Sequence, residues 1–419
     1  MNTRLHKTNS PNDGNGYAEI PMSSPDLSEA EREAVAAVLR TPRLSMGSET
    51  EAFEAAFKAY TGCRRAIAVS SGTAGLHLCV RAAGITDGDL VLTTPFSFVA
   101  SANVLLFERA IPVFVDVEIR TGNLDVEQLA EAARDLADGG AAARRWLPRQ
   151  GVPSRSTSSS HSRRDGALRA ILSVDVFGQP ADMDRIQAVA REHGLALIED
   201  ACEALGAEYK GRLAGTLGDY GVYAFYPNKQ ITTGEGAVIV TDDEQAGMLM
   251  DALRNQGRAP GDTWLQHTYL GYNYRLDEMS AALGRVQMGR IEELLRKRER
   301  VATWYNERLA KMPGVELPMV HPDTTRVSWF VYVIRLSPGI DRQQVASDLK
   351  EYGIPARPYF LPIHLQPYMV ERFGYRTGDY PRTEDLGRRG LALPFSGVMS
   401  EAQVDHVCRS LRQALSNKI

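Results

Sequence analysis

The sequence predicts an α/β protein, with a large domain built on a wide, mostly parallel sheet and a smaller C-terminal α+β domain. From Arg65 to about Asn255, short apolar runs alternate with amphipathic stretches, as in parallel strands joined by crossover helices. After Asp277 this rhythm gives way to long helical stretches and isolated strands. At 419 residues the chain also exceeds what one compact core usually contains.

The large sheet is expected to contain seven buried strands, one for each short apolar run. These runs are residues 65–69, 90–93, 112–117, 170–176, 195–199, 222–225 and 237–241. Apolar residues at helical spacing predict a helix at 76–83 and crossover helices at 126–136, 183–193 and 244–255.

The chain is expected to divide into three parts. Residues 1–18 are polar and lack an apolar segment, so we expect a disordered tail rather than a signal peptide. Residues 19–280 are expected to form the large domain, and residues 281–419 a linking helix and the small domain. Further elements are expected as a long helical stretch from 277 to 311, a strand at 327–336, helices at 342–352 and 401–415, and a Pro-rich connection at 354–368 that reaches the active site.

Residues 138–165 interrupt the α/β pattern. They contain a Gly-Gly-Ala-Ala-Ala run, a serine-rich stretch and several arginines. Such a composition buries too little apolar area to offset the entropy of ordering the chain. We therefore expect a flexible surface insertion, with its arginines solvated rather than forming a binding site.

The composition favours a cytoplasmic protein without nucleic acid, membrane or metal as partner. The net charge is −4 and no basic stripe follows a predicted helix, so nothing indicates a phosphate backbone. No apolar stretch approaches the length that crosses a bilayer. The four cysteines are scattered, without a CxxC pair or a histidine at metal-ligand spacing, which fits a reducing compartment.

The first candidate site segment is Ser71-Gly72-Thr73, between a predicted strand and a predicted helix. Free backbone N–H groups at a helix start, together with a nearby hydroxyl, bind phosphate well. Glycine turns between a strand and a helix are equally common for steric reasons alone. By itself this segment leaves both interpretations open.

The second candidate is Asp200, at the end of the apolar strand that continues through Leu197, Ile198 and Glu199. Ligands of α/β proteins bind at the carboxyl edge of the sheet, where this carboxylate is expected to lie. Beside a pyridine nitrogen it would keep that nitrogen protonated. Asp200 is at least as well explained, from this strand alone, as the N-cap of a following helix.

The third candidate is Lys229, in a glycine-bounded loop that follows the apolar run 222–225 and precedes Thr233-Gly234-Glu235-Gly236. Desolvation and nearby positive charge lower the pKa of a lysine amine enough for it to react with a carbonyl carbon. Most lysines are solvated surface charges, so Lys229 alone is weak evidence of catalysis.

Taken together and in this order, the three candidates resemble fold-type I pyridoxal-phosphate enzymes of the aspartate aminotransferase superfamily. Four motifs are more specific and are similar to the DegT/DnrJ/StrS family of sugar aminotransferases. They are 199–206 (EDACEALG), 218–229 (GDYGVYAFYPNK), 233–236 (TGEG) and 271–276 (GYNYRL). The resemblance covers the chain from about Ser45 to the C-terminus, apart from the insertion.

The resemblance implies specific roles around a pyridoxal 5'-phosphate cofactor that cycles through pyridoxamine 5'-phosphate. Lys229 would form the Schiff base and move the proton, and Asp200 would pair with the ring nitrogen. Phe98 would stack on the ring, and Gly72 and Thr73 would bind its phosphate. Phe98 is otherwise a plausible core residue.

Asn273 is implied to reach the phosphate of the neighbouring subunit's cofactor, which requires a homodimer with shared active sites.

Two positions depart from the family pattern. Glu203 stands where the family usually has Gln or His bonding the cofactor's phenolic oxygen, so it must be protonated, bridged by water or turned away. Ala224 stands where the family often has a phosphate-binding serine, and Asn228 is a candidate to replace that contact. A cofactor-binding partner protein without turnover is therefore kept as an alternative.

The family's activity implies transfer of an amino group from glutamate or glutamine to a keto group of a nucleotide-linked sugar, for surface polysaccharide or a glycosylated metabolite. A ketocyclitol or aminoglycoside-precursor acceptor is the nearest alternative. Tyr359, His364 and Met46 match segments near the sugar site, although Tyr359 and His364 are equally well explained as packing residues.

Overall fold

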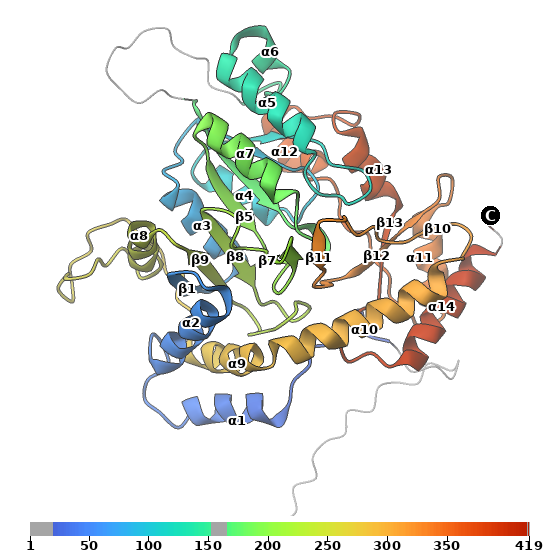
Figure 1. Cartoon of the computed structure of the whole chain (residues 1–419), viewed down its shortest axis with the longest axis horizontal. Coiled ribbons are helices and arrows are strands. Elements are labelled where there is room, and N and C mark those ends of the chain that lie inside the picture. Colours follow the sequence, from blue (N-terminus) through green and yellow to red (C-terminus); the bar gives the residue numbers. More distant parts are fainter. Residues whose placement is uncertain (1–19, 152–165, 417, 419) are drawn as a thin grey trace, which may run out of the picture.

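A seven-stranded sheet forms the centre of the protein (Figure 1). The computed structural model describes residues 20–151, 166–416 and 418. The strands lie in the order β1-β9-β8-β5-β4-β2-β3, and only β9 runs antiparallel to its neighbours. Their bounds are β1 Arg65–Val69, β2 Leu90–Thr93, β3 Ile111–Phe114, β4 Leu168–Val174, β5 Ala196–Asp200, β8 Tyr220–Ala224 and β9 Ala237–Thr241. All seven predicted strands and the mostly parallel sheet are confirmed.

Helices cover both faces of this sheet because alternate strand residues point to opposite sides. On β1, Ile67 and Val69 face one core cluster while Ala66 and Ala68 face another. The large domain contains α1 Glu29–Val38, α2 Ser48–Thr61, α3 Gly72–Ala82, α4 Ala100–Phe107, α5 Val126–Asp138, α7 Met183–His193 and α8 Glu244–Arg254. The three predicted crossover helices correspond to α5, α7 and α8.

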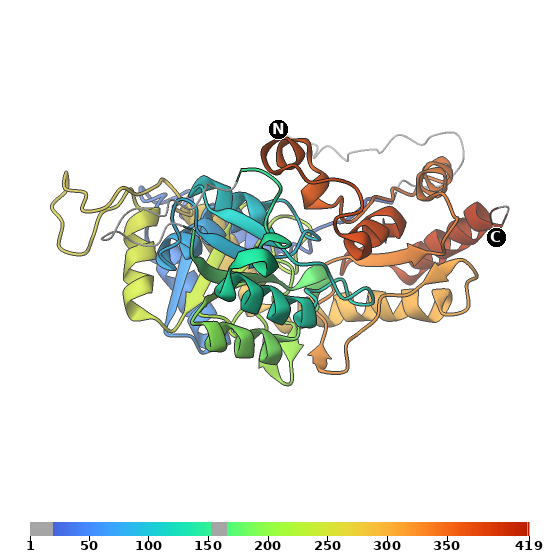
Figure 2. The ribbon, with the colours of Figure 1, turned by 90° about the horizontal axis from the view of Figure 1, so that it is seen from above.

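A second layer lies beside the sheet and contains the C-terminal elements (Figure 2). Its three-stranded sheet has the order β10-β12-β13, and another small sheet has the order β11-β6-β7. The strands are β6 Glu208–Tyr209, β7 Arg212–Leu213, β10 Val315–Glu316, β11 Thr324–Arg326, β12 Tyr332–Leu336 and β13 Gly390–Leu393. The helices of the C-terminal part are α11 Arg342–Glu351, α12 Pro367–Phe373, α13 Pro381–Arg389 and α14 Glu401–Leu415. One 3-10 turn, Ile363–Leu365, precedes α12, and another, Val176–Gly178, follows β4 of the large sheet.

The predicted long helix after Asp277 is two helices. α9 spans Glu278–Gly289 and α10 spans Ile291–Leu309, separated at Arg290, whose φ of −108° and ψ of 5° are not helical. α10 runs from the large sheet to the second layer, where it contacts α14 (Figure 1). α10 is therefore the part of the predicted linking helix that connects the large sheet with the second layer.

Two segments pack across the predicted division at residue 280. Ile20 lies in the core of the second layer, and its N–H donates to the Gly353 carbonyl at 3.3 Å. Met369 and Phe373 of α12 instead lie in a core cluster of the large sheet. The division into 19–280 and 281–419 stays a prediction about domains, but these contacts cross it in both directions.

The predicted flexible insertion at 138–165 is wrong for its first half. Residues 140–144 form helix α6 (Gly140–Arg144), and Ala143 is buried. The Trp146 ring N–H donates to Asp135 at 2.8 Å, and Arg149 donates to Asp379 at 2.6 Å. These contacts order a polar segment that periodicity alone cannot identify. Residues 152–165, like the predicted tail at 1–18, lie outside the described residues.

Glu278 joins the start of α9 to the start of α2. Its carboxylate accepts backbone N–H groups of Gly47, Glu49 and Thr50 at 2.8 to 3.0 Å, and also the Thr50 hydroxyl. Burial opposes ionisation, but the four hydrogen bonds outweigh it and hold the pKa of Glu278 below its usual range. A carboxylate therefore satisfies the free N–H groups of a helix start.

We expect Glu278→Gln to lower the free energy of unfolding by about 1–3 kcal/mol at neutral pH, because an amide nitrogen would face N–H donors. The depressed pKa means that the wild-type advantage is present above the unfolded-state pKa and is lost as the pH falls through the folded-state pKa. Thermal unfolding of both proteins between pH 7 and pH 3 would measure this. A stability difference between wild type and Glu278→Gln that stayed the same at pH 3 would contradict this role of the Glu278 carboxylate. Glu29→Gln, on the exposed face of α1, is the control.

Candidate active site

The carboxyl ends of the parallel strands bring the predicted site residues to one edge of the sheet. β5 ends at Asp200, β8 runs into the turn that carries Lys229, and β1 is followed by the start of α3 at Gly72. A Cβ placed on Gly72 would lie 2.9 Å from the Ala224 Cβ and 3.0 Å from the Cys202 Sγ. The segments that follow β1, β5 and β8 are therefore in close contact.

Asp200 is a buried carboxylate held in a fixed position. It is 5% exposed, and its Oδ2 accepts the Ser101 hydroxyl at 2.7 Å. Its Oδ1 accepts the Cys202 N–H at 3.2 Å. Ser101 lies in the first turn of α4 and Cys202 in the turn after β5, so two separate segments orient one carboxylate. Asp200 is followed by a turn rather than by a helix of its own, so the alternative of a simple N-cap does not apply.

Lys229 points its amine into a confined space beside an aromatic ring and a carboxyl group. Its side chain is 12% exposed, and its Nζ lies 3.8 Å from the Glu203 Oε1. The same Nζ lies 3.8 Å from the centroid of the Phe330 ring, within the range of a cation–π interaction. Phe330 precedes β12, so the second layer supplies one wall around the amine.

Glu203 faces Lys229 and is not turned away. Its other oxygen, Oε2, accepts the Phe177 N–H at 2.9 Å. Burial raises the pKa of Glu203, although the Lys229 amine and the Phe177 N–H act in the opposite direction. The geometry therefore places a carboxyl group within reach of the lysine amine.

Arg298 on α10 ties the lysine turn to the second layer. Its guanidinium donates to the backbone carbonyls of Asn228 at 3.0 Å and Lys229 at 2.5 Å, and to those of Trp329 and Phe330 at 3.1 and 3.3 Å. Within the described part of the chain no acidic side chain pairs with it, and burial lowers the pKa of Arg298 to about 10. A buried cation thus holds the turn that carries Lys229.

The start of α3 and the side chain of Asn228 offer further polar contacts to a ligand. The Ser71 hydroxyl caps the helix by accepting the Ala74 N–H at 3.1 Å, while Gly72 and Thr73 occupy its first turn, where N–H groups have no intrahelical acceptor. The Asn228 Oδ1 is buried and has no hydrogen-bond partner among the described residues. A buried amide oxygen without a partner indicates a place for a bound group.

These residues fit pyridoxal 5'-phosphate. An amine suits its aldehyde carbon, a fixed carboxylate suits its ring nitrogen, and a helix start suits its phosphate. The described residues contain no cluster of ligating side chains suited to a metal ion, and no helix among them has the length and apolar character to span a membrane.

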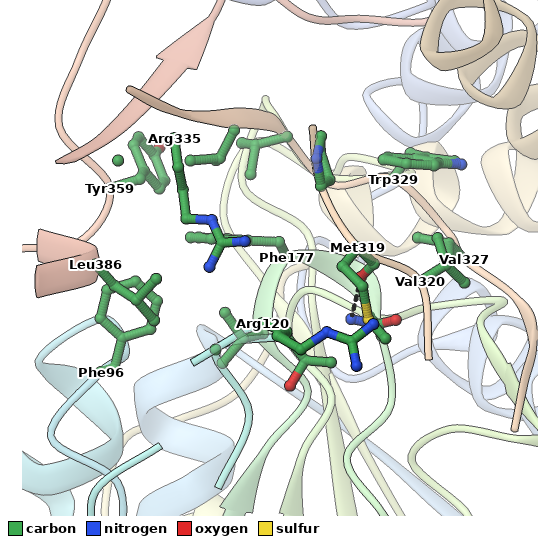
Figure 3. A pocket seen from close by; sticks show the side chains of 18 residues that line it. Phe96, Arg120, Phe177, Met319, Val320, Val327, Trp329, Arg335, Tyr359 and Leu386 are labelled. Atoms are coloured by element: carbon green, nitrogen blue, oxygen red, sulfur yellow. Dashed lines mark hydrogen bonds between the residues drawn. The ribbon is translucent and has the colours of Figure 1, made fainter. Parts of the chain in front are cut away.

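A cavity between the two layers opens beside this site (Figure 3). Tyr359 and Phe177 line it. Arg335 of β12 points into its middle, and Arg120 runs along its lower edge toward Met319 (Figure 3). Tyr359 also contacts the Phe330 ring at 6.3 Å between centroids, and burial raises the pKa of its hydroxyl. Tyr359 therefore lies between the cavity and the lysine.

His364 is not at the site, contrary to its predicted contact with substrate. It is completely buried, its Nε2 lies 3.0 Å from the Glu384 carboxylate, and its ring contacts Tyr375 and Tyr380. Burial lowers the pKa of His364. The Pro-rich connection crosses the edge of the large sheet here, and packing explains the residue.

The other predicted residues lie near the surface. Phe98, in the loop after β2, is 63% exposed and therefore is not a core residue. Asn273 is exposed on the segment whose neighbour Tyr274 accepts the Ser70 N–H at 2.8 Å. Met46 is half-buried with a φ of +51°, next to Gly47 and the start of α9. None of these three side chains has a contact with Lys229 or Asp200 within this chain's described residues.

Sequence reasoning missed four residues of the site: Ser101, Phe177, Arg298 and Phe330. Arg298 had a detectable signal, because its spacing from Leu294, Val301 and Tyr305 places it on the apolar face of α10. Dense charges on both sides of Arg298 in the sequence obscure this spacing. Ser101, Phe177 and Phe330 contact segments that are distant in sequence, and no local sequence pattern indicates such contacts.

The chain is similar to known proteins over nearly its whole length. A family model described as the DegT/DnrJ/EryC1/StrS aminotransferase family matches residues 25–412. GDP-perosamine synthase of Caulobacter vibrioides is 37% identical over 400 residues, which cover 94% of this chain and 98% of that protein. Spore coat polysaccharide biosynthesis protein SpsC of Bacillus subtilis is 33% identical over 409 residues, covering 94% and 96%. The solved structure of DesV from S. venezuelae has a TM-score of 0.81 at 30% identity, covering 95% and 98%.

Proposed function

Because this chain belongs to the DegT/DnrJ/EryC1/StrS aminotransferase family, we propose that it transfers an amino group from glutamate or glutamine to a keto group of a nucleotide-linked sugar. It is a pyridoxal-phosphate-dependent aminotransferase. Relatives named for GDP-perosamine and for a spore coat polysaccharide support a sugar acceptor and a role in amino-sugar biosynthesis. The observation that carries the proposal is the confined Lys229 amine beside the buried, fixed carboxylate of Asp200 at one sheet edge.

In this proposal six residues hold the cofactor. Lys229 binds it covalently and Asp200 pairs with its ring nitrogen, while Phe98 lies on the ring face. Gly72 and Thr73 at the start of α3 bind its phosphate, with Asn228 supplying the contact that Ala224 cannot make. When bound, pyridoxal phosphate supplies a ring that withdraws the electrons left behind when a Cα proton departs.

The protein's own groups then control where protons lie. Asp200, fixed by the Ser101 hydroxyl and the Cys202 N–H, holds a proton at the ring nitrogen. The Lys229 Nζ carries the proton that leaves the donor carbon, and the Phe330 ring restricts the positions open to that amine. Arg298 keeps the Lys229 backbone in place during these movements, because four carbonyl groups hold its guanidinium. Burial of these side chains excludes water that would compete for the protons.

We further propose that the enzyme acts in the cytoplasm as a homodimer with shared active sites. Asn273 is exposed on the segment next to β1, where its amide is free to approach the cofactor phosphate of a second copy. The exposed residues Trp264, Leu265 and Leu270 precede it, and an apolar surface of this kind favours contact with protein. A second copy would cover them.

The acceptor site is proposed to lie on the Tyr359 side of Lys229. Tyr359 lines the cavity between the layers and contacts the Phe330 ring, so an acceptor there would reach the amine. Met46 is proposed to approach the acceptor from the segment before α2. A ketocyclitol acceptor would need the same geometry at the lysine. The two acceptors would therefore differ only in the part of the molecule that lies farther from the lysine than Tyr359.

The donor half of the reaction can be tested without knowing the acceptor. We expect the enzyme loaded with pyridoxal phosphate to convert L-glutamate or L-glutamine to the matching 2-oxo acid, one equivalent per subunit, and then to stop. Mass spectrometry of the 2-oxo acid would measure this. Turnover should resume on addition of the correct ketosugar, with GDP-linked ketosugars tested first. Absence of any 2-oxo acid from either donor would contradict the proposed donors and favour a partner protein without turnover.

A further inference from the structure

We propose that Glu203 and Lys229 share one proton, so that Glu203 is the acid–base partner of the lysine amine. The proposal concerns two side chains of this chain before any cofactor binds. It rests on the proposed function only for the use that the enzyme makes of the amine.

The two groups face each other in a space closed to water. The Glu203 Oε1 lies 3.8 Å from the Lys229 Nζ, and the two side chains are 8% and 12% exposed. The other carboxylate oxygen is occupied by the Phe177 N–H at 2.9 Å, which leaves Oε1 as the oxygen available to the amine. At this separation and burial, opposite charges interact more strongly than they do at the surface.

The backbone around Phe177 is arranged to keep Glu203 in this position. Phe177 has a φ of +59°, an unfavourable value for a bulky residue. Its N–H is thereby aimed at Glu203, while its ring stacks on Phe360 with centroids 5.2 Å apart. Strain at a residue that orients a neighbouring carboxyl group is typical of functional sites.

The ionisable groups around the pair come from three segments. Asp200 at the end of β5 and the thiol of Cys202 lie on one side, and the phenol of Tyr359 lies on the side of the second layer. Arg298 on α10 contacts the Lys229 carbonyl. Asp200 adds negative charge and Arg298 adds positive charge beside the pair, so the two neighbouring charges oppose each other.

One proton shared by Glu203 and Lys229 leaves the pair without net charge between these opposing charges. In the resting pair the amine is an ammonium ion and Glu203 is a carboxylate. A proton first passes from the Nζ ammonium to the Glu203 Oε1, giving a neutral amine and a neutral carboxylic acid. The neutral amine then attacks a carbonyl carbon: a C–N bond forms as the C–O π bond breaks, and Glu203 returns the proton to the carbonyl oxygen. No other reactant is needed, and no net charge is left in the buried space. Burial raises the pKa of Glu203 and so makes it a suitable acceptor.

The test is the pH dependence of Lys229 labelling in the protein without cofactor. Each lysine is labelled with 1-fluoro-2,4-dinitrobenzene across a pH series, and the rate at Lys229 is read by peptide mass spectrometry. In Glu203→Gln, which still accepts the Phe177 N–H, we expect the midpoint for Lys229 to fall by at least about one pH unit because the neighbouring negative charge is gone. In Glu203→Asp, which keeps that charge, the midpoint should stay closer to wild type.

Matched controls separate this effect from a general loosening of the structure. The exposed Lys58 and Lys210 in the same digest should keep their midpoints in every variant. Glu54→Gln removes a partly buried carboxyl group, one that pairs with Arg254, and should leave the Lys229 midpoint unchanged. A Lys229 midpoint that is the same in wild type and Glu203→Gln would overturn the proposal.

A second measurement detects the proton on Glu203 directly. Lys229→Met removes the cation, so burial should leave Glu203 neutral at pH 7 and produce the infrared carbonyl stretch of a carboxylic acid. That band should vanish in Lys229→Met/Glu203→Gln. A band that survives in the double variant would show that another group carries it, which contradicts the assignment. Neither measurement uses cofactor or turnover, so failure here is distinguishable from failure of the proposed reaction.

Discussion

Lys229→Ala is expected to abolish covalent attachment of pyridoxal phosphate and to reduce amination on the order of 100-fold to 10,000-fold, the usual contribution of a positioned acid–base group. The methyl group of alanine has no nitrogen to bind the cofactor or to carry the Cα proton. The fold should survive, because Arg298 contacts the backbone carbonyls of this turn and not the lysine side chain. Borohydride reduction followed by peptide mapping would locate the cofactor, and a coupled assay would give the rate.

Lys58→Ala is the matched control, since Lys58 is exposed on α2. It should bind cofactor and turn over like the wild type. A small primary amine added to Lys229→Ala should restore part of the rate, because the space beside Phe330 then lacks only the amine. Reduced cofactor found on another lysine in the wild-type protein would remove Lys229 from its proposed role.

Asp200→Asn is expected to keep the fold and lower turnover by roughly 100-fold to 1,000-fold, as the loss of a fixed electrostatic partner typically does. The asparagine oxygen can still accept the Cys202 N–H while its amide nitrogen donates to the Ser101 hydroxyl, so the loop geometry is conserved. The amide carries no negative charge and therefore cannot keep the ring nitrogen protonated. Turnover and circular dichroism measured on the same preparation would separate this loss from misfolding.

Ser101→Ala tests the positioning of the same carboxylate. Asp200 keeps its charge in this variant but loses one of two hydrogen bonds, so we expect a smaller effect, roughly tenfold on turnover. Turnover should therefore be lower in Asp200→Asn than in Ser101→Ala. Equal losses in both would mean that the orientation of Asp200 matters as much as its charge, and normal turnover in Asp200→Asn would remove it from the chemistry.

The sequence by itself determined the sheet and the order of the chemical groups along it. Each strand of the large sheet is a short apolar run bounded by polar residues, and β1, β2 and β9 begin and end where that pattern predicts. Such strands are buried on both faces, so their apolar character does not depend on which segment packs against them. Asp200 and Lys229 follow two of these strands, and the carboxyl ends of parallel strands meet at one edge.

Only the tertiary structure decided what surrounds these groups. Phe330 lies over the Lys229 amine and Arg298 holds its backbone, yet both come from elements more than sixty residues away. His364 was predicted at the site and lies in the core, because the Pro-rich connection leaves the site after Tyr359 and packs on the large sheet, where the Ile363 N–H donates to the Pro95 carbonyl. The periodicity of a segment's own sequence does not indicate which distant residues its side chains contact. The sequence pattern therefore predicts the scaffold and its edge, whereas packing between the layers selects the neighbours that tune the chemistry there.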